Sequence, residues 1–136
     1  MDSLSLSTGD SGVTFCEPIR DDDGWLDSFS VRIDETGLRA EARVENSGVI
    51  QAPEGFFSEL AQSWRGWTGE KTWRSLEAEL ALVATTDSCG HVTLEVRLRP
   101  DAGPGAWRVI SYAYFEAGQL ASLACRAAQF FGRRLD

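Results

Sequence analysis

The sequence predicts an α+β fold: one six-stranded antiparallel sheet, in the order βββα–βββα, with two helices packed on one face. Three patterns support this prediction. Several segments alternate apolar and polar residues with a period of two, which is typical of half-buried strands. Two segments instead carry apolar residues at helical spacing. Short loops separate long strands, which favours antiparallel pairing with the helices on one side. The length of 136 residues suits a single domain.

The chain begins with a segment that does not look like an element of the fold. Residues 1–12 are rich in Ser, Gly and Asp, and we expect a disordered lead there, followed by one domain over 13–136. A short first strand is expected at 13–19, where Pro18 stops it. An acidic loop follows.

The next two strands, 26–33 and 38–45, form the first expected hairpin. Apolar and polar residues alternate in both, so one face of each strand is expected in the core. A four-residue loop, 34–37, joins them and puts both apolar sets on the same face. The expected pairs are Ile33 with Leu38 and Val31 with Ala40.

The pattern changes to a helical period over 52–64. Pro53 fits the first helical turn, and Gly66 is expected to end the helix. Trp64 completes the apolar stripe and is therefore expected in the core. The stripe consists of Phe56, Phe57, Leu60, Ala61 and Trp64.

A second hairpin is expected from strands at 75–87 and 91–99. The three residues between them end in Gly90, which suits the left-handed position of a three-residue hairpin loop. The resulting register is consistent on both faces of the hairpin. It pairs Leu80 with Leu98, Leu82 with Val96, Ala84 with Leu94, Thr85 with Thr93 and Glu79 with Arg99.

The end of the chain is expected to supply a sixth strand at 107–115 and a second helix at 116–132. Glu116 near the helix start complements the helix dipole, and Gly132 is expected at its end. The residues expected to face the core are Leu120, Leu123, Ala124, Ala127 and Phe131.

The net charge of −8 is unevenly distributed. Residues 1–70 hold 14 acidic and 5 basic side chains, whereas residues 71–136 hold 7 acidic and 8 basic ones. An acidic surface repels nucleic-acid phosphates, so no nucleic-acid partner is expected. It would steer a basic partner toward the protein, or it would serve only solubility.

The sequence also bears on location and redox state. No apolar run approaches the ~20 residues of a membrane helix, and the start of the chain lacks the features of a secretory signal. We therefore expect a cytoplasmic protein with no membrane partner. Cys16, Cys89 and Cys125 are widely spaced, which is typical of reduced thiols rather than of disulfides or a zinc site.

No set of catalytic residues stands out, and we expect no catalytic residue, metal or cofactor. His91 is the single histidine, and at the start of a hairpin strand it fits a surface turn. Glu77 and Glu79 share a predicted strand face, where they could act as an acid/base pair. However, Arg99 opposite Glu79 would lower the pKa of that carboxyl rather than raise it.

The aromatic residues give the candidate binding positions. The segment 63–75 holds three of the five tryptophans, with Arg65 and Arg74 beside them. Trp67 and Trp73 either cover the end of the core as a lid or form a surface that binds a partner; Trp and Arg are typical of such surfaces. The candidate partner-binding residues are Asp21, Asp22, Asp23, Arg65, Trp67, Trp73, Arg74, Tyr112 and Tyr114.

Three blocks of sequence carry a family resemblance: FFSELAQSWRGWTGEKTWRSLEAEL, GHVTLEVRLR and EAGQLASLA. Together they resemble a family of small uncharacterised actinobacterial proteins, catalogued as a domain of unknown function, over roughly residues 26–131. The resemblance implies no established activity and hence no catalytic residues. In size and acidity the chain is also similar to immunity proteins, which bind and neutralise toxins; this is analogy.

Two functions remain from the sequence. The first is a non-enzymatic protein-binding module, of the type of an immunity protein that inhibits a basic toxin or enzyme. The alternative is a small-molecule-binding domain or minor enzyme, with an aromatic-lined pocket between sheet and helices and His91, Glu77 and Glu79 as its titratable groups. A homodimer formed through an edge strand is a further possibility that would use Tyr112 and Tyr114.

Overall fold

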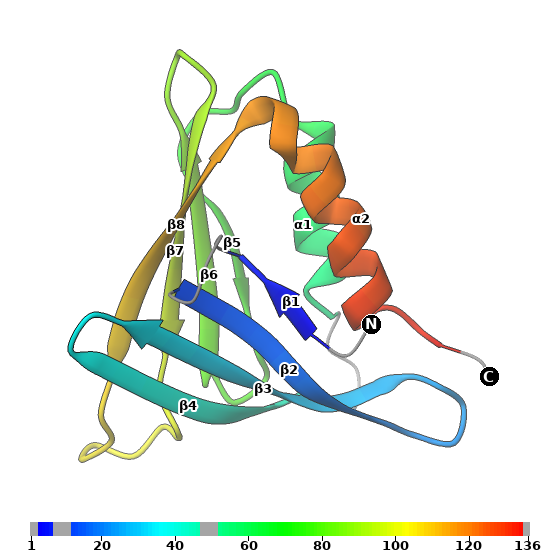
Figure 1. Ribbon diagram of the computed structural model, residues 1–136, viewed down its shortest axis with the longest axis vertical. Helices are drawn as coiled ribbons and strands as arrows, with labels where there is room; N and C mark the ends of the chain where they lie inside the picture. The colour runs from blue at the N-terminus through cyan, green and yellow to red at the C-terminus, as the bar shows by residue number, and fades with distance from the viewer. Residues whose placement is uncertain (1–2, 7–11, 47–51, 135–136) are drawn as a thin grey trace.

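The computed structural model describes residues 3–6, 12–46 and 52–134. They form two successive runs of four strands, each followed by a helix (Figure 1). The first run is β1 (Ser3–Ser5), β2 (Gly12–Arg20), β3 (Leu26–Glu35), β4 (Leu38–Glu45) and then α1 (Glu54–Gln62). The second run is β5 (Lys71–Arg74), β6 (Leu80–Thr86), β7 (His91–Leu98), β8 (Val109–Glu116) and then α2 (Leu120–Phe131), with a 3₁₀ turn at Ala117–Gln119 before α2.

The strands form two separate four-stranded antiparallel sheets, so the prediction of one six-stranded sheet was wrong. The first sheet has the order β1-β2-β3-β4 and the second has the order β5-β6-β7-β8. Each sheet is a meander, in which strands that follow one another along the chain are paired. In Figure 1 the strands of the two sheets run across one another, and the two helices lie side by side along the open side that the two sheets leave.

The first strand overturns part of the predicted disordered lead. Ser3–Ser5 pairs with β2, and this pairing places Leu4 opposite Phe15. This strand is the edge strand of the first sheet, and Leu4 and the following Leu6 are both buried in the core. Gly12 likewise belongs to β2. The rest of the predicted lead, residues 1–2 and 7–11, lies outside the described residues.

The β3–β4 hairpin forms, but its predicted register was wrong by two residues. Glu35 pairs with Leu38, so Thr36 and Gly37 alone make the turn. Gly37 has a φ of +77°, which suits a two-residue turn of this kind. Because the shift is an even number, both apolar sets still face the core. The observed pairs are Val31 with Ala42 and Ile33 with Ala40.

The register predicted for the second hairpin is confirmed inside β6 and β7. Leu80 pairs with Leu98, Leu82 with Val96, Ala84 with Leu94 and Thr85 with Thr93. Gly90 has the left-handed φ of +83° that the loop requires. However, β6 begins only at Leu80. Residues 75–79 form a turn rather than the start of the strand, so the predicted strand face with Glu77 and Glu79 is not formed.

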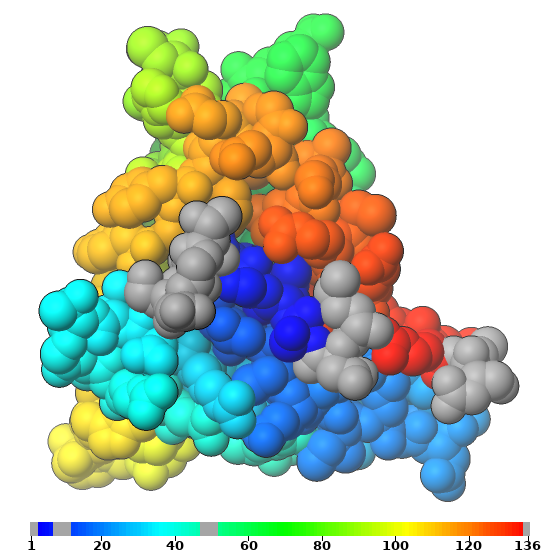
Figure 2. Space-filling view, viewed as in Figure 1, coloured from blue at the N-terminus to red at the C-terminus, as the bar shows by residue number. Residues whose placement is uncertain are grey.

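One core joins both sheets and both helices. Phe131 of α2 contacts Phe15 and Phe29 of the first sheet and stacks on Phe57 of α1. Figure 2 shows the blue N-terminal strand lying against the orange-red α2 at the surface. Trp64 was wrongly expected in this core: α1 ends at Gln62, and the Trp64 side chain is 54% exposed.

Hydrogen bonds made by side chains also join the two halves of the structure. Ser111 of β8 donates from Oγ to a carboxylate oxygen of Glu35 on β3, at 2.9 Å. The buried Glu79 accepts the backbone N–H of Glu45 at 3.1 Å.

Neither helix is long and apolar enough to cross a membrane, within the ranges that the structure describes.

Candidate binding face on the second sheet

In the described part of the chain, the second sheet is covered on one side only. The side chains of Leu82, Leu94 and Ala113 point inward and are buried against the first sheet and the helices. Side chains alternate along each strand, so their sequence neighbours point away from the core. We call this second side the outer face. It consists of Thr72, Arg74, Ala81, Val83, Thr85, Thr93, Glu95, Arg97, Ile110, Tyr112 and Tyr114.

The outer face carries a row of large exposed side chains along β8. Ile110, Tyr112 and Tyr114 are 53%, 48% and 71% exposed. We call these three residues the tyrosine row. Within the described part of the chain neither tyrosine hydroxyl makes a hydrogen bond, so both keep their polar end free for a partner. Tyrosine offers a large contact area together with one hydrogen-bonding group, which is why it is common at interfaces.

A groove of about 540 Å³ lies beside the tyrosine row. β8 is the last strand of its sheet, and the groove lies between this strand, β1 and the start of α2. Arg126 of α2 donates from Nη1 to the backbone oxygen of Ser5 at 3.1 Å, which holds α2 to β1 at this place. The tyrosine row therefore borders a groove, and the opposite wall of this groove is formed by β1 and α2.

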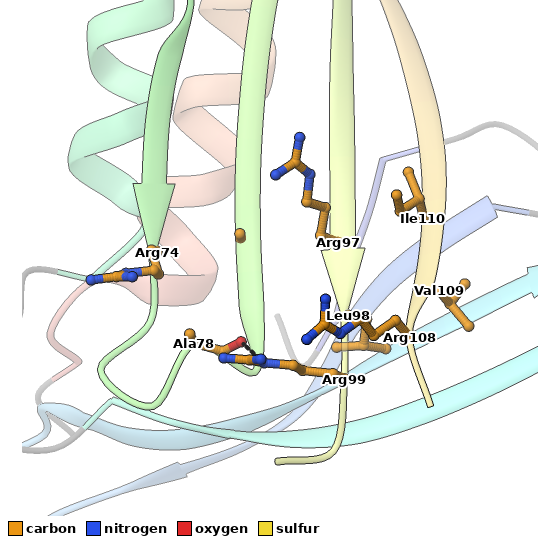
Figure 3. A pocket seen from close by; sticks show the side chains of 9 residues that line it. Arg74, Ala78, Arg97, Leu98, Arg99, Arg108, Val109 and Ile110 are labelled. Atoms are coloured by element: carbon orange, nitrogen blue, oxygen red, sulfur yellow. Dashed lines mark hydrogen bonds between the residues drawn. The ribbon is translucent and has the colours of Figure 1, made fainter. Parts of the chain in front are cut away.

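At the other end of the outer face four arginines surround one open pocket. Arg74, Arg97, Arg99 and Arg108 all line this pocket, which has a volume of about 350 Å³ (Figure 3). We call it the arginine pocket. Its remaining wall is apolar, and no acidic residue lines it within the ranges that the structure describes. The other lining residues are Ala78, Ala81, Leu98, Val109 and Ile110.

The strand register explains why these arginines meet. Arg74 of β5 pairs with Ala81 of β6, Ala81 pairs with Arg97 of β7, and Arg97 pairs with Ile110 of β8. The four residues thus form one row across the sheet. The small side chain of Ala81 leaves the space between two arginines open. Arg99 and Arg108 come from the loop ends just beyond β7 and before β8.

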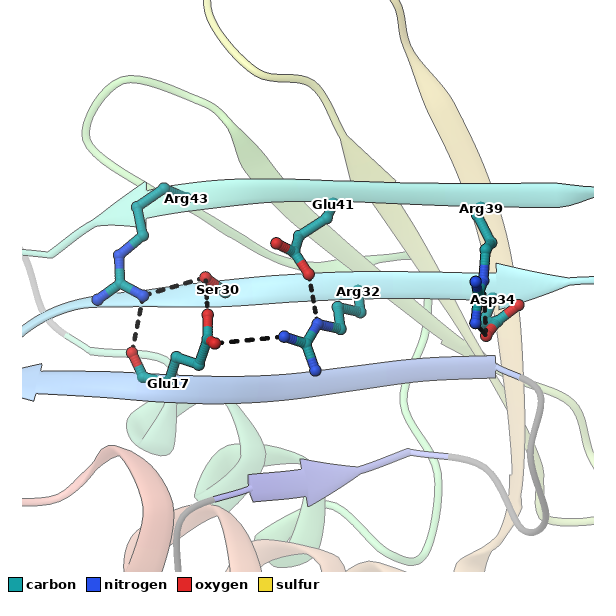
Figure 4. Close-up of polar contacts among 7 residues, drawn as sticks. All are labelled: Glu17, Ser30, Arg32, Asp34, Arg39, Glu41 and Arg43. Carbon is teal, nitrogen blue, oxygen red and sulfur yellow. Dashed lines mark hydrogen bonds and ion pairs between the residues drawn. The ribbon is translucent and has the colours of Figure 1, made fainter.

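The outward side of the first sheet is different, because its charges are balanced there (Figure 4). Arg32 pairs with Glu17 and Glu41, and Arg39 pairs with Asp34. Arg43 donates to the backbone oxygen of Glu17 and to the hydroxyls of Ser28 and Ser30. A solvent-exposed sheet face whose basic and acidic side chains pair with one another is ordinary, and this surface fits that description.

The structure brings three of the predicted site residues together and separates the others. Arg74, Tyr112 and Tyr114 share the outer face. Trp73 lies on the opposite, inward side, where it pairs with Leu82 and packs against the core. Trp67 also packs on the core and donates from its indole nitrogen to the backbone oxygen of Ala84 at 3.3 Å.

The remaining predicted site residues lie elsewhere. Asp21, Asp22 and Asp23 are exposed at the β2–β3 turn, where Oδ1 of Asp21 accepts the backbone N–H groups of Asp23 and Trp25. Arg65 lies after α1, with its guanidinium 5.1 Å from the ring centre of the exposed Trp64.

The three titratable groups of the alternative function do not share a site. His91 is exposed at one end of β7, and Nδ1 lies 2.9 Å from Oδ2 of Asp87. This contact raises the pKa of His91 above its usual value. Glu79 is buried near the other end of the hairpin, since its neighbour Leu80 pairs with Leu98. Glu77 lies exposed in the turn before β6.

Four residues that line the arginine pocket were not among the predicted site residues: Arg97, Arg99, Arg108 and Ile110. The sequence contains one partial signal for them. The hairpin register places Arg97 beside Ala81, and a strand containing Arg74 next to Ala81 would have completed the row.

Within the described ranges no three His, Cys, Asp or Glu side chains gather so that they could hold a metal ion.

Comparison with known families adds one finding to this geometry. A family model matches residues 4–134, which is nearly the whole chain. The chain belongs to DUF6228, a family of unknown function. The DUF6228 match includes both sheets and both helices, and so the whole outer face described above. A search of curated proteins and a search of solved structures each found no match.

Proposed function

We propose that this protein is a non-enzymatic protein-binding module that binds its partner through the tyrosine row. The observation that carries the proposal is the exposure of Ile110, Tyr112 and Tyr114 side by side on an uncovered sheet face. Exposed apolar and aromatic side chains that gather in one patch are typical of interaction sites, whereas scattered ones are ordinary.

The rest of the molecule supports a binding role over the alternative function. The layer between the sheets and the helices is filled by phenylalanine side chains that contact one another edge to face. The pocket and the groove described above open instead on the surface. The partner that fits the tyrosine row is a protein with an apolar patch of its own and with acceptors for the two free hydroxyls.

A photo-cross-linking experiment tests the proposal. A benzophenone amino acid replaces Tyr114, and in a control it replaces Arg39 on the charge-balanced first sheet. After irradiation of the source cells we expect a discrete adduct from position 114 and none from position 39. The adduct is identified by mass spectrometry, and the purified partner should bind Tyr112→Ser about tenfold more weakly than the wild type.

Each outcome of this experiment has a clear meaning. A partner whose affinity falls with Tyr112→Ser supports the proposal. An adduct between two copies of this chain would make the partner a homodimer through the β8 side of the molecule, as the sequence also allowed. Equal labelling from positions 114 and 39, or an affinity that Tyr112→Ser leaves unchanged, would overturn the proposal.

A second candidate, the immunity-type inhibitor of a basic toxin or enzyme, is favoured by the β2–β3 turn. Asp22 and Asp23 are exposed there, and the neighbouring Trp25 is 53% exposed, with the Arg133 guanidinium 5.1 Å from its ring centre. An exposed aromatic beside acidic side chains suits a basic partner. In this form of the proposal, association with the partner slows as salt rises and slows further in Asp22→Lys/Asp23→Lys. An association rate independent of salt would contradict it.

Two further expectations belong with these proposals. The cytoplasmic location remains a prediction from the sequence, and so does the actinobacterial origin that the family resemblance implies. Fractionation of the source cells, with this protein detected by antibody, tests the first of them.

A further inference from the structure

The arginine pocket differs from the outward side of the first sheet in that its charges are not balanced. Arg74 and Arg108 make no hydrogen bond and no ion pair with any described residue. Arg97 pairs with Glu95, and Nε of Arg99 donates to the backbone oxygen of Ala78 at 2.8 Å. Two guanidinium groups are therefore held in place, and two are free.

The fixed arginines still have donors to offer. A guanidinium carries five N–H groups, and the contacts of Arg97 and Arg99 use the Nε–H of each. Their terminal nitrogens remain available, together with all the donors of Arg74 and Arg108. Figure 3 shows Arg99 and Arg108 both extending across the end of the sheet, and Arg74 at the end of β5.

This arrangement favours the binding of a negative group. Like charges that share a small site repel one another, and the pocket gathers four arginines with no acidic residue among the described residues that line it. The net charge of the chain is −8, so solubility does not call for a cluster of positive charge. On the first sheet, by contrast, Arg32 and Arg39 each have a carboxylate partner.

We propose that the arginine pocket binds a phosphate monoester whose organic part is apolar. A phosphate monoester carries a charge of about −1.5 to −2 near pH 7 and offers three acceptor oxygens, which matches several guanidiniums better than the two oxygens of one carboxylate do. The apolar walls formed by Ala81, Val109 and Ile110 would contact the organic part. A volume of about 350 Å³ suits a small ligand or a single modified side chain.

The proposal does not depend on the tyrosine row binding a protein, because the pocket can be tested with small molecules alone. Phenyl phosphate is the main probe, with inorganic phosphate, benzoate and benzyl alcohol as comparisons. Binding is measured by isothermal titration calorimetry and by amide chemical shifts in ¹⁵N-labelled protein. We expect saturable binding of phenyl phosphate, weaker binding of inorganic phosphate and benzoate, and none of benzyl alcohol.

Variants locate the binding. Arg74→Gln and Arg108→Gln remove guanidiniums that have no partner in the described chain, so both should fold normally. Each should weaken phenyl phosphate binding about tenfold or more, because each removes charge-assisted hydrogen bonds. Arg39→Gln, an exposed arginine of the first sheet, is the matched control and should leave the affinity unchanged. Amide shifts should be largest in β7 and around Val109 and Ile110.

A second arm identifies the source of the phosphate group. A short peptide with one phosphoserine is compared with phenyl phosphate and with the unphosphorylated peptide. Tighter binding of the phosphopeptide would identify the group as one carried by a protein, and tighter binding of phenyl phosphate would identify a small metabolite. The proposal is overturned if phenyl phosphate binds no better than benzoate. It is also overturned if Arg74→Gln and Arg108→Gln bind phenyl phosphate as the wild type does.

Discussion

Gly24 at the β2–β3 turn sits against the end of the chain. Its φ is +86°, and its backbone oxygen accepts the N–H of Arg134 at 2.9 Å. A Cβ atom on residue 24 would lie 1.9 Å from the backbone oxygen of Arg134. The residue therefore has to be glycine for two separate reasons, the left-handed backbone and the close contact.

We predict that Gly24→Ala lowers the free energy of unfolding by about 2–4 kcal/mol, because a strained φ and a backbone clash both act against the folded state. Gly37→Ala is the matched control: its φ is +77°, but nothing lies within 4 Å of the added Cβ, so we expect a loss of only about 1 kcal/mol. Urea denaturation of both variants measures the difference. Equal losses would show that the C-terminal residues do not hold this turn.

His91 and Asp87 form a pair that depends on pH. The hydrogen bond from the His91 ring to Asp87 raises the pKa of His91 above 6.5, and the carboxylate of Glu116 adds to this. The pKa of Asp87 is lowered below 3.8, first by the backbone N–H of His91 and then by its ring. The stabilisation from His91 is thus fully present below pH 6.5 and disappears as pH rises through the raised pKa. That from Asp87 is present above pH 3.8 and disappears as pH falls through the lowered pKa.

An NMR titration of the single histidine checks this prediction. We expect a pKa above 6.5 in the wild type and a lower value in Asp87→Asn, in which Oδ1 can still accept the N–H groups of Cys89 and His91. Glu116→Gln should lower the pKa less, because its oxygen lies 3.6 Å from Nε2. An unchanged pKa in Asp87→Asn would contradict the pairing.

The turn between β5 and β6 was not predicted, because the alternating pattern led us to expect a strand from residue 75 onward. Its buried residue Glu79 accepts the hydroxyl of Ser75 at 2.7 Å and the backbone N–H of Glu45 at 3.1 Å. Ser75 in turn accepts the N–H of Leu80. One carboxylate thus closes the turn and also holds β4 of the other sheet.

We expect Glu79→Ala to lower the free energy of unfolding by about 2–3 kcal/mol, because it leaves the Ser75 hydroxyl and the Glu45 N–H without an acceptor. Glu77→Ala, in the same turn but exposed, should change the free energy by no more than about 0.5 kcal/mol. Thermal and urea unfolding measure both. A similar small effect of the two substitutions would mean that Glu79 does not join the sheets.

Local patterns predicted individual elements well and the sheet they belong to badly. The β6–β7 register followed from Gly90 and from the agreement of both faces, which are features within one hairpin. The division into two sheets depends on whether a strand of the first run pairs with a strand of the second run. No local pattern in the sequence contains that information. β1 was missed because three residues, only one of them apolar, are too short for a periodic signal.

At the scale of the whole molecule, local sequence patterns likewise predicted only part of the candidate site. Tyr112 and Tyr114 could be found from their spacing on one strand. The arginine pocket could not, because its four arginines come from β5, β7 and the segments beyond β7 and before β8. Only the order of all four strands places Arg74 and Arg108 at the same pocket. Charged residues that look ordinary in the sequence thus form an unusual cluster in space.

Phe131 links the parts of the molecule, and we predict that Phe131→Ala costs about 3–5 kcal/mol of the free energy of unfolding. Its ring contacts Phe15, Phe29 and Phe130 and stacks on Phe57 at 6.2 Å. Phe131→Leu keeps most of the volume and should cost less.

Far-UV circular dichroism and tryptophan fluorescence should report the same urea midpoint in the wild type. Two separate transitions would show that the sheets unfold independently.

The position of α2 has a consequence for how the protein is made. Phe130 and Phe131 fill the space over β2 and β3, yet they are translated about a hundred residues after those strands. A ribosome adds roughly 5–20 residues per second, so several seconds pass before α2 can cover the apolar side of the first sheet. During that interval a nascent chain exposes Phe15 and Phe29, and a chaperone that recognises apolar segments would find them there.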